Sequence, residues 1–178
     1  NVIDANSYSV DKIRDMTEST RKIGLGVMGF ADMLANMRVP YDSEKGLELG
    51  RKVMRFVRDE SDQMSEELAE SRGVFPAFEG SIYDAPGQPR MRNACRLTVA
   101  PTGTISIFAG CSGGIEPIFA VAFMRNQAGA LMPDVNPQFV ARAKAEGWYS
   151  EDLMTRIAED GHIHFPEVPA EVQEVFKT

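Results

Sequence analysis

The stretch NACRLTVAPTGTISIFAGCSGGIEPIF, residues 93–119, gives the clearest indication of the fold. Its first part, residues 96–100, is short, β-branched and apolar, and Pro101 ends it, a pattern typical of a buried strand. A turn rich in hydroxyl groups follows at residues 102–106, and it leads into the apolar run 105–109. We therefore expect a strand, a turn and a buried helix in direct succession.

The turn at residues 102–106 has the composition of an anion site. Backbone N–H groups at a helix N-terminus have no partner within the helix and carry a partial positive charge, and hydroxyl groups add donors. The alternative is that Thr102 or Thr104 only caps the helix. The residues alone leave phosphate binding and simple capping equally open.

Composition and charge narrow the classes of function. The chain has 178 residues, 43% of them apolar, which suits one globular domain or a large piece of one. A net charge of −7 without a basic run argues against direct DNA binding and against an anionic membrane surface. The sequence has no apolar stretch near the roughly 18 residues that span a bilayer. Two cysteines make no disulfide framework, so we expect a cytoplasmic protein, and the abrupt start suggests a segment of a longer one.

Hydrophobic periodicity and capping residues predict helices over most of the remaining chain. The expected helices cover residues 10–22, capped by Ser9; residues 31–37; a long helix after Asp42 and Ser43 with the stripe Leu47, Gly50, Met54, Val57, Ser61, Met64 and Leu68, ended by Gly73; a helix from Asn136 to Gly147; one from Ser150 to Gly161; and a short one after Pro169.

Three segments lack this helical pattern. Residues 74–92 are expected to be irregular but packed down by Phe75, Phe78, Ile82 and Tyr83. Residues 119–124 read as a second buried strand, and residues 126–134 as a mobile loop. The expected fold is therefore α/β and helix-rich, with few strands.

Two motifs resemble ligand sites, but the sequence around each does not suit such a site. Residues 24–29 match the G-x-G-x-x-G pattern of dinucleotide-binding folds, but a charged helix precedes them instead of an apolar strand. Small residues for close packing explain them better. His162 and His164 are two imidazoles that would share one face of a strand, yet the surrounding sequence favours surface histidines over a metal site.

Three further side chains are candidate catalytic groups. Cys95 and Cys111 lie in apolar sequence and are expected to be buried, inert thiols, with a radical or nucleophilic role as the alternative. Glu116 stands inside an apolar run, where an acid is either paired or functional. A structural hydrogen-bonding role is favoured for it.

Four blocks of this sequence closely resemble ribonucleotide reductase large (catalytic) chains of the class II, adenosylcobalamin-dependent form. They are residues 21–34, Arg92-Asn93, residues 99–106 and residues 109–117. The motifs Ala-Pro-Thr-Gly-Thr-Ile-Ser and Gly-Ile-Glu-Pro occur at the spacing of that family. The resemblance runs from the first residues to about Arg125. It implies a ten-stranded α/β barrel, with residues 1–178 as a single-domain fragment of its second half and residues 126–178 as a less certain, helical C-terminal part.

The resemblance also implies roles for particular residues. The residues that would line the substrate's phosphate pocket are Thr102, Gly103, Thr104, Ile105 and Ser106. The family's radical cysteine stands in an Asn-x-Cys-x-Glu motif, but Leu97 replaces the glutamate after Cys95, so Cys95 is rejected for that role. The radical motif, the allosteric site and the redox cysteines are expected outside this segment. No catalytic residue and no metal ligand is therefore expected within it.

By resemblance, the chain is a fragment of a reductase that converts ribonucleoside di- or triphosphates to deoxyribonucleotides by thiyl-radical chemistry. The full-length enzyme would use adenosylcobalamin and a dithiol reductant such as thioredoxin and would form a homodimer, whereas the segment alone would not turn over. Two alternatives remain. One is a fragment of a class I-type large chain, which takes its radical from a separate metal-containing subunit. The other is a non-catalytic nucleotide-binding or scaffold domain.

Overall fold

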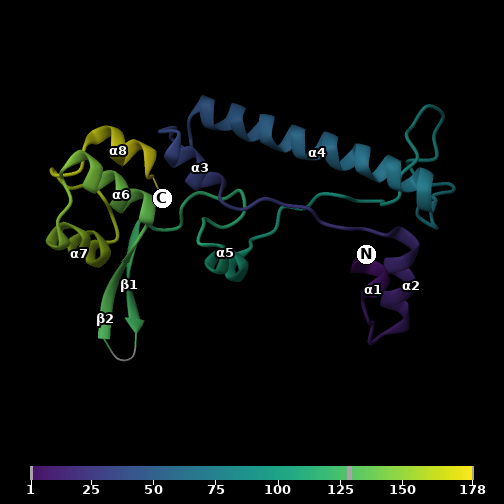
Figure 1. Ribbon diagram of the computed structural model, residues 1–178, viewed down its shortest axis with the longest axis horizontal. Coiled ribbons are helices and arrows are strands. Elements are labelled where there is room, and N and C mark those ends of the chain that lie inside the picture. Colours follow the sequence, from purple (N-terminus) through teal and green to yellow (C-terminus); the bar gives the residue numbers. More distant parts are fainter. Residues whose placement is uncertain (1, 128–129, 178) are drawn as a thin grey trace. The chain divides into compact units, whose positions relative to one another are not determined.

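The computed structural model describes residues 2–127 and 130–177 (Figure 1). The chain divides into two compact units, each built from two stretches of sequence. The first unit contains Asn1–Gly26 and Arg51–Ala100, and the second contains Val27–Gly50 and Pro101–Thr178.

Within the described residues the chain is helix-rich with few strands, as expected, and its two strands form a hairpin that the sequence did not predict. The helices are α1 (Val2–Ala5), α2 (Asp11–Thr20), α3 (Phe30–Asn36), α4 (Glu44–Arg72), α5 (Gly103–Ala109), α6 (Pro137–Glu146), α7 (Glu151–Asp160) and α8 (Ala170–Val175). The strands β1 (Ala122–Gln127) and β2 (Ala130–Val135) pair antiparallel, with Ala122 opposite Val135. None of the helices in the described part is both long and apolar enough to cross a bilayer.

Helix α4 follows its sequence signals at both ends. The Ser43 hydroxyl accepts a hydrogen bond of 3.1 Å from the Gly46 N–H, so Ser43 is the cap that the sequence predicted as one of two candidates. Gly73 has a φ of 82°, the left-handed backbone typical of a residue that ends a helix. The buried face differs from the predicted stripe, because Ser65 and Ala69 are buried whereas Leu47 and Met64 are exposed.

Asn93 connects three segments of the first unit. Its side-chain Nδ2 donates to the Arg21 carbonyl at 2.8 Å, and its backbone N–H donates to the Ser65 hydroxyl at 3.2 Å. Beside it, the irregular residues 74–92 pack down through Phe75, Phe78 and the partly buried Tyr83, as predicted, and Met91 joins them. Ile82, which was expected to help, is exposed.

Two expectations for the first unit are wrong. Residues 96–100 form no buried strand: Leu97 makes one isolated parallel bridge with Leu25, and Val99 is 74% exposed. An apolar run becomes a strand only when neighbouring strands pair with its backbone. Within the described residues, the segment around Leu25 is the one backbone partner of residues 96–100, and it forms a single bridge. Helix α2 begins after Val10, which makes no side-chain cap, so Ser9 is not its cap.

The core of the second unit is built around helices α6, α7 and α8. Phe139, Leu153, Val172 and Phe176 are almost completely buried there. The capping predictions are confirmed, since the Asn136 side chain accepts from the Phe139 N–H at 3.1 Å and the Ser150 hydroxyl accepts from the Leu153 N–H at 3.1 Å. Gly147 and Gly161 end α6 and α7 with positive φ.

The hairpin corrects the predicted mobile loop at residues 126–134. Its described residues pair as β1 and β2, and α7 packs against both strands. Met124 and Val135 pack against the core and so join the hairpin to it. The second predicted strand begins at Ala122 instead of residue 119, and Phe119 is exposed. Residues 128–129 lie outside the described residues.

Candidate phosphate-binding site

The predicted hydroxyl-rich turn opens helix α5 of the second unit. Thr102 directly precedes the helix with φ of 55° and ψ of 26°, a left-handed conformation that is uncommon for residues other than glycine. The first intrahelical bond is donated by the Ser106 N–H to the Thr102 carbonyl at 2.9 Å. The N–H groups of residues 103–105 come before this first donor, so the helix offers them no carbonyl partner.

Neither threonine caps this helix. No side chain at Thr102 bonds to the first-turn N–H groups. Its hydroxyl instead accepts a hydrogen bond of 2.7 Å from the Gly114 backbone N–H. Thr104 stands inside the helix as its second residue. The capping alternative is thus wrong, and the donors at the start of α5 are left for another acceptor.

A second loop, residues 110–116, lies against α5 and is held by α3. The Asp32 carboxylate accepts from the Ser112 backbone N–H at 2.6 Å, and the Ser112 hydroxyl accepts from the Asp32 N–H at 3.3 Å. The Gly29 N–H donates to the Ser112 carbonyl at 2.9 Å, and the Tyr41 hydroxyl donates to the Ile115 carbonyl at 2.9 Å. Asp32 is only 7% exposed, so α3 fixes this loop with a buried carboxylate.

Two adjacent glycines let the loops approach each other. A Cβ at Gly113 would lie 3.1 Å from the Pro101 carbonyl oxygen, and Gly114 has a φ of 52°. Larger residues here would push the second loop away from Thr102. The Ser-Gly-Gly sequence therefore serves the close contact between the two loops.

The five predicted phosphate ligands lie together but present different groups. Gly103, Thr104 and Ile105 are exposed, whereas Ser106 is buried and its hydroxyl donates to the Gly103 carbonyl at 3.3 Å. The Thr104 side chain and the first-turn N–H groups are accordingly the accessible donors. Thr102 and Ser106 hold the shape of the turn.

The sequence did not single out Asp32, although it holds the neighbouring loop. A signal was present, because Asp32 is an acid among the apolar residues of α3, Phe30–Ala35. Burying a carboxylate without partners is costly, so such a residue usually marks a hydrogen-bonded anchor.

Several other candidates are not where the sequence placed them. Cys95 is exposed, contrary to expectation, and its thiol donates to the Leu97 carbonyl at 3.4 Å. Cys111 is half-buried beside Gly29. Glu116 is exposed, so it is not a buried acid, and its backbone N–H donates to the Gly113 carbonyl at 3.2 Å.

The remaining two motifs follow their simpler interpretations. A Cβ at Gly24 would lie 2.8 Å from the Thr98 Cγ2, and one at Gly26 would lie 2.9 Å from the Thr98 carbonyl oxygen, which confirms the close-packing role. His162 and His164 are exposed and stack on each other at 5.8 Å. Across residues 2–127 and 130–177, no three histidine, cysteine or acidic side chains are grouped to hold a metal ion.

The whole chain matches the family model described as "Ribonucleotide reductase, barrel domain", over residues 1–90 and 86–178. The chain therefore belongs to the ribonucleotide reductase barrel-domain family. This confirms the resemblance that the four sequence blocks carry.

The most informative relatives share a name. The chain is 52% identical over 178 residues to "Vitamin B12-dependent ribonucleoside-diphosphate reductase" of Thermoplasma acidophilum, covering 99% of this chain and 23% of that protein. It is 45% identical to the protein of the same name from Mycobacterium tuberculosis, covering 99% of this chain and 25% of that one. The chain thus spans about a quarter of the length of these relatives.

A solved structure shows the same fold. The "Actinobacillus ureae class Id ribonucleotide reductase alpha subunit" matches 93% of this chain and 29% of its own, with a TM-score of 0.74 and 23% sequence identity. The helix-rich architecture with few strands is consistent with part of a reductase barrel.

Proposed function

We propose that this chain is the part of a vitamin B12-dependent ribonucleoside-diphosphate reductase that grips the substrate's phosphates. The observation that carries the proposal is the uncapped start of α5, with Thr102 turned away to Gly114. The relatives at 45–52% identity carry that name, which favours a diphosphate as substrate.

The proposed binding mode uses the five residues 102–106. Backbone N–H groups of Gly103, Thr104 and Ile105, together with the Thr104 hydroxyl, donate to phosphate oxygens. Thr102 and Ser106 line the turn and keep it open. The positive end of the short helix α5 adds a favourable field for the anion.

We assign no catalytic residue to this chain, so its part in the reaction is to bind and orient the substrate. When bound to the full-length enzyme, adenosylcobalamin would supply the radical chemistry. The resemblance puts that cofactor mostly outside this segment, and no residue here is assigned to it. A dithiol reductant such as thioredoxin, a homodimer and a cytoplasmic location complete the proposal for the full-length protein.

We place the segment in the second half of a ten-stranded α/β barrel, as one domain that includes residues 126–178. The paired extended segments around Leu25 and Leu97 would then be barrel strands that find further neighbours elsewhere in the longer chain. The exposed Val99 suits this assignment, because a barrel strand becomes buried only when both its sides are covered.

The class I-type alternative is less well supported. A class I large chain takes its radical from a separate metal-containing subunit, and the "Ribonucleoside-diphosphate reductase large subunit" of Caenorhabditis elegans is only 26% identical to this chain. The Actinobacillus ureae neighbour, at 23% identity, supports the fold and does not distinguish between the two classes of reductase.

The experiment that tests the proposal is reduction of a ribonucleoside diphosphate by the full-length protein with a dithiol. We expect activity that requires adenosylcobalamin and no second subunit, and none from the 178-residue segment alone. Activity that needs a metal-containing subunit instead would establish the class I alternative. Nucleotide binding without reduction under either condition would establish a binding or scaffold domain.

The phosphate grip is tested separately in the same protein. Thr104→Ala combined with Ser106→Ala should raise the Michaelis constant for the diphosphate. An unchanged Michaelis constant and rate would refute the assignment of residues 102–106 even in an active reductase.

A further inference from the structure

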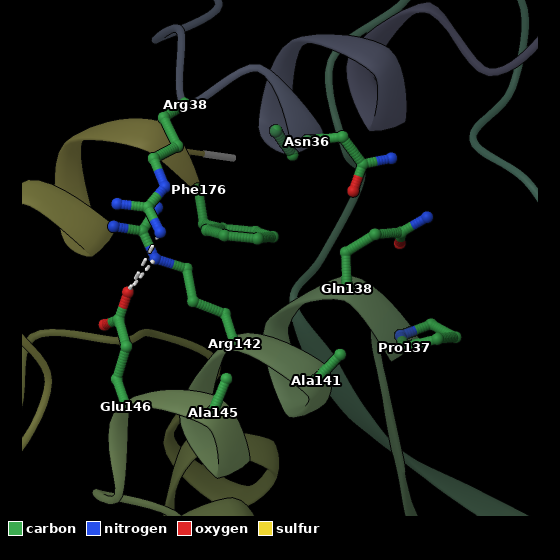
Figure 2. A pocket seen from close by; sticks show the side chains of 10 residues that line it. Asn36, Arg38, Pro137, Gln138, Ala141, Arg142, Ala145, Glu146 and Phe176 are labelled. Atoms are coloured by element: carbon green, nitrogen blue, oxygen red, sulfur yellow. Dashed lines mark hydrogen bonds and ion pairs between the residues drawn. The ribbon is translucent and has the colours of Figure 1, made fainter.

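A pocket of about 540 Å³ lies on the second unit, between the end of α3 and the outer side of α6 (Figure 2). Its wall is formed partly by small residues of α6, Ala141 and Ala145, and by the Phe176 ring. The pocket uses none of the residues 102–106. Its volume is within the range typical of small-molecule sites.

Arg142 lines this pocket and has one buried guanidinium nitrogen without a partner among the described residues. Its side chain is only 10% exposed. Two of its guanidinium nitrogens donate to carboxylates: Nε to Glu146 Oε1 at 2.9 Å and Nη2 to Glu171 Oε1 at 2.7 Å. Its Nη1 is buried and has no hydrogen-bond partner in the part of the chain that the structure describes. A buried charged donor without an acceptor is unfavourable, so an acceptor is missing here.

Arg38 brings a second positive charge to the same place. Its φ of 57° is left-handed, and its 68% exposed side chain reaches to within 3.8 Å of Glu146 Oε1 through Nη2. Figure 2 shows both guanidinium groups converging on the Glu146 carboxylate. An ion pair of that length on an exposed side chain contributes little, so Arg38 retains donors for a ligand.

Two carboxylates meet the two arginines: Glu146 is near both, and Glu171 pairs with Arg142. Glu146 is the one carboxylate among the pocket's lining residues, and its other oxygen, Oε2, already accepts from the Trp148 indole at 3.1 Å. Glu171 is 70% exposed and does not line the pocket. Asn36 and Gln138 add amide groups at the other end (Figure 2).

We propose that this pocket binds an oxyanion, a phosphate or carboxylate group of a small molecule, through Arg142 Nη1 and the Arg38 guanidinium. Two guanidinium groups are the donors best suited to a planar or tetrahedral oxyanion. The amides of Asn36 and Gln138 bind the neutral remainder of that molecule. This is a second site, distinct from the proposed substrate-phosphate grip.

The single tryptophan of the chain provides the readout, because Trp148 is hydrogen-bonded to the carboxylate that both arginines approach. Inorganic phosphate and, separately, acetate are titrated into the ¹⁵N-labelled full-length protein at constant ionic strength, and the Trp148 indole cross-peak, assigned by its loss in Trp148→Phe, is followed. We expect a saturable shift. Arg38→Ala should weaken the binding about tenfold, whereas Arg55→Ala, which removes the same charge from an exposed site on α4, should leave it unchanged.

The two titrants identify the source of the oxyanion. A response to phosphate alone supports a phosphoryl-bearing ligand, and an equal response to acetate supports a carboxylate. Arg142→Lys keeps the charge but removes Nη1, and it should also weaken binding; if that variant does not fold, Arg38→Ala still decides. A cross-peak that shows no saturable shift with either anion, or an equal affinity in Arg38→Ala and Arg55→Ala, would overturn the proposal.

Discussion

The hydroxyl of Thr102 accepts a hydrogen bond of 2.7 Å from the backbone N–H of Gly114, twelve residues further along the chain. This bond joins the turn before α5 to the loop that Asp32 anchors. It also takes the Thr102 side chain away from the start of the helix, which therefore remains uncapped. One side chain thus both stabilises the site and leaves its donors accessible.

Replacing Thr102 by valine should destabilise the second unit. Valine has a similar shape but no acceptor, so the buried Gly114 N–H loses its partner, at a cost of about 1–3 kcal/mol in the free energy of unfolding. Urea unfolding measures the change. Thr102→Ser, which keeps the hydroxyl, should remain close to the unmodified chain, and equal losses in the two variants would contradict the assigned bond.

Removing the Asp32 carboxylate should loosen the loop at residues 110–116. Asp32→Ala leaves the Ser112 N–H without its acceptor inside the fold and should cost about 1–3 kcal/mol of unfolding free energy. Asp32→Asn retains a carbonyl oxygen and should cost less. Asp59→Ala is the matched control, because Asp59 is exposed and pairs with its neighbour Arg58; it should change stability by no more than about 1 kcal/mol.

Gly26 and Gly103 should respond oppositely to alanine. A Cβ at Gly26 would lie 2.9 Å from the Thr98 carbonyl oxygen, a backbone atom that cannot move away cheaply. Gly26→Ala should therefore lower the unfolding free energy by about 1–3 kcal/mol. Gly103 has nothing within 4 Å and lies in a helix, so Gly103→Ala should be neutral or stabilising. Thermal unfolding distinguishes the two, and a harmless Gly26→Ala would refute the packing role.

Glu146 should make stability depend on acidic pH. A hydrogen bond from the Trp148 indole, with further help from Arg142 and Arg38, holds the pKa of this carboxyl below its ordinary value of 4.5. A carboxyl with a lowered pKa in the folded state stabilises the fold above its ordinary pKa, and this contribution is lost as the pH falls through the lowered value.

The matching variant is Glu146→Gln, which cannot ionise. Its deficit in unfolding free energy relative to the unmodified chain, present at neutral pH, should shrink as the pH falls below about 4.5. Urea unfolding at a series of pH values measures the difference. A deficit that stays constant across that range would show that the charge of Glu146 does not contribute.

Features that depend on neighbouring residues were predictable from the sequence. The caps Asn136 and Ser150 and the terminating glycines Gly147 and Gly161 act within one turn of their helices, so their residue types suffice. The length of α4 likewise follows from its own periodicity and ends.

Features that depend on distant partners were not predictable. Residues 96–100 have the composition of a strand, but their only described bridge is to Leu25, whose position the sequence does not reveal. The stretch containing the candidate site was found, yet the contacts that shape it were not. Asp32 and Ser112 are eighty residues apart, and no local pattern predicts that they meet.

The pocket beside α6 was missed for a similar reason. Arg38 and Arg142 meet at Glu146 only because α3 packs against α6, and each arginine alone resembles an ordinary surface charge in the sequence.

The central claim is that the start of α5 binds the phosphates of the substrate. Its most direct test compares the dissociation constants of a ribonucleoside diphosphate and of the corresponding nucleoside, measured by calorimetry on the full-length protein and on its Thr104→Val variant. The account predicts that the variant binds the diphosphate about tenfold more weakly and the nucleoside as before. Unchanged diphosphate affinity, or an equal loss for both ligands, would contradict it.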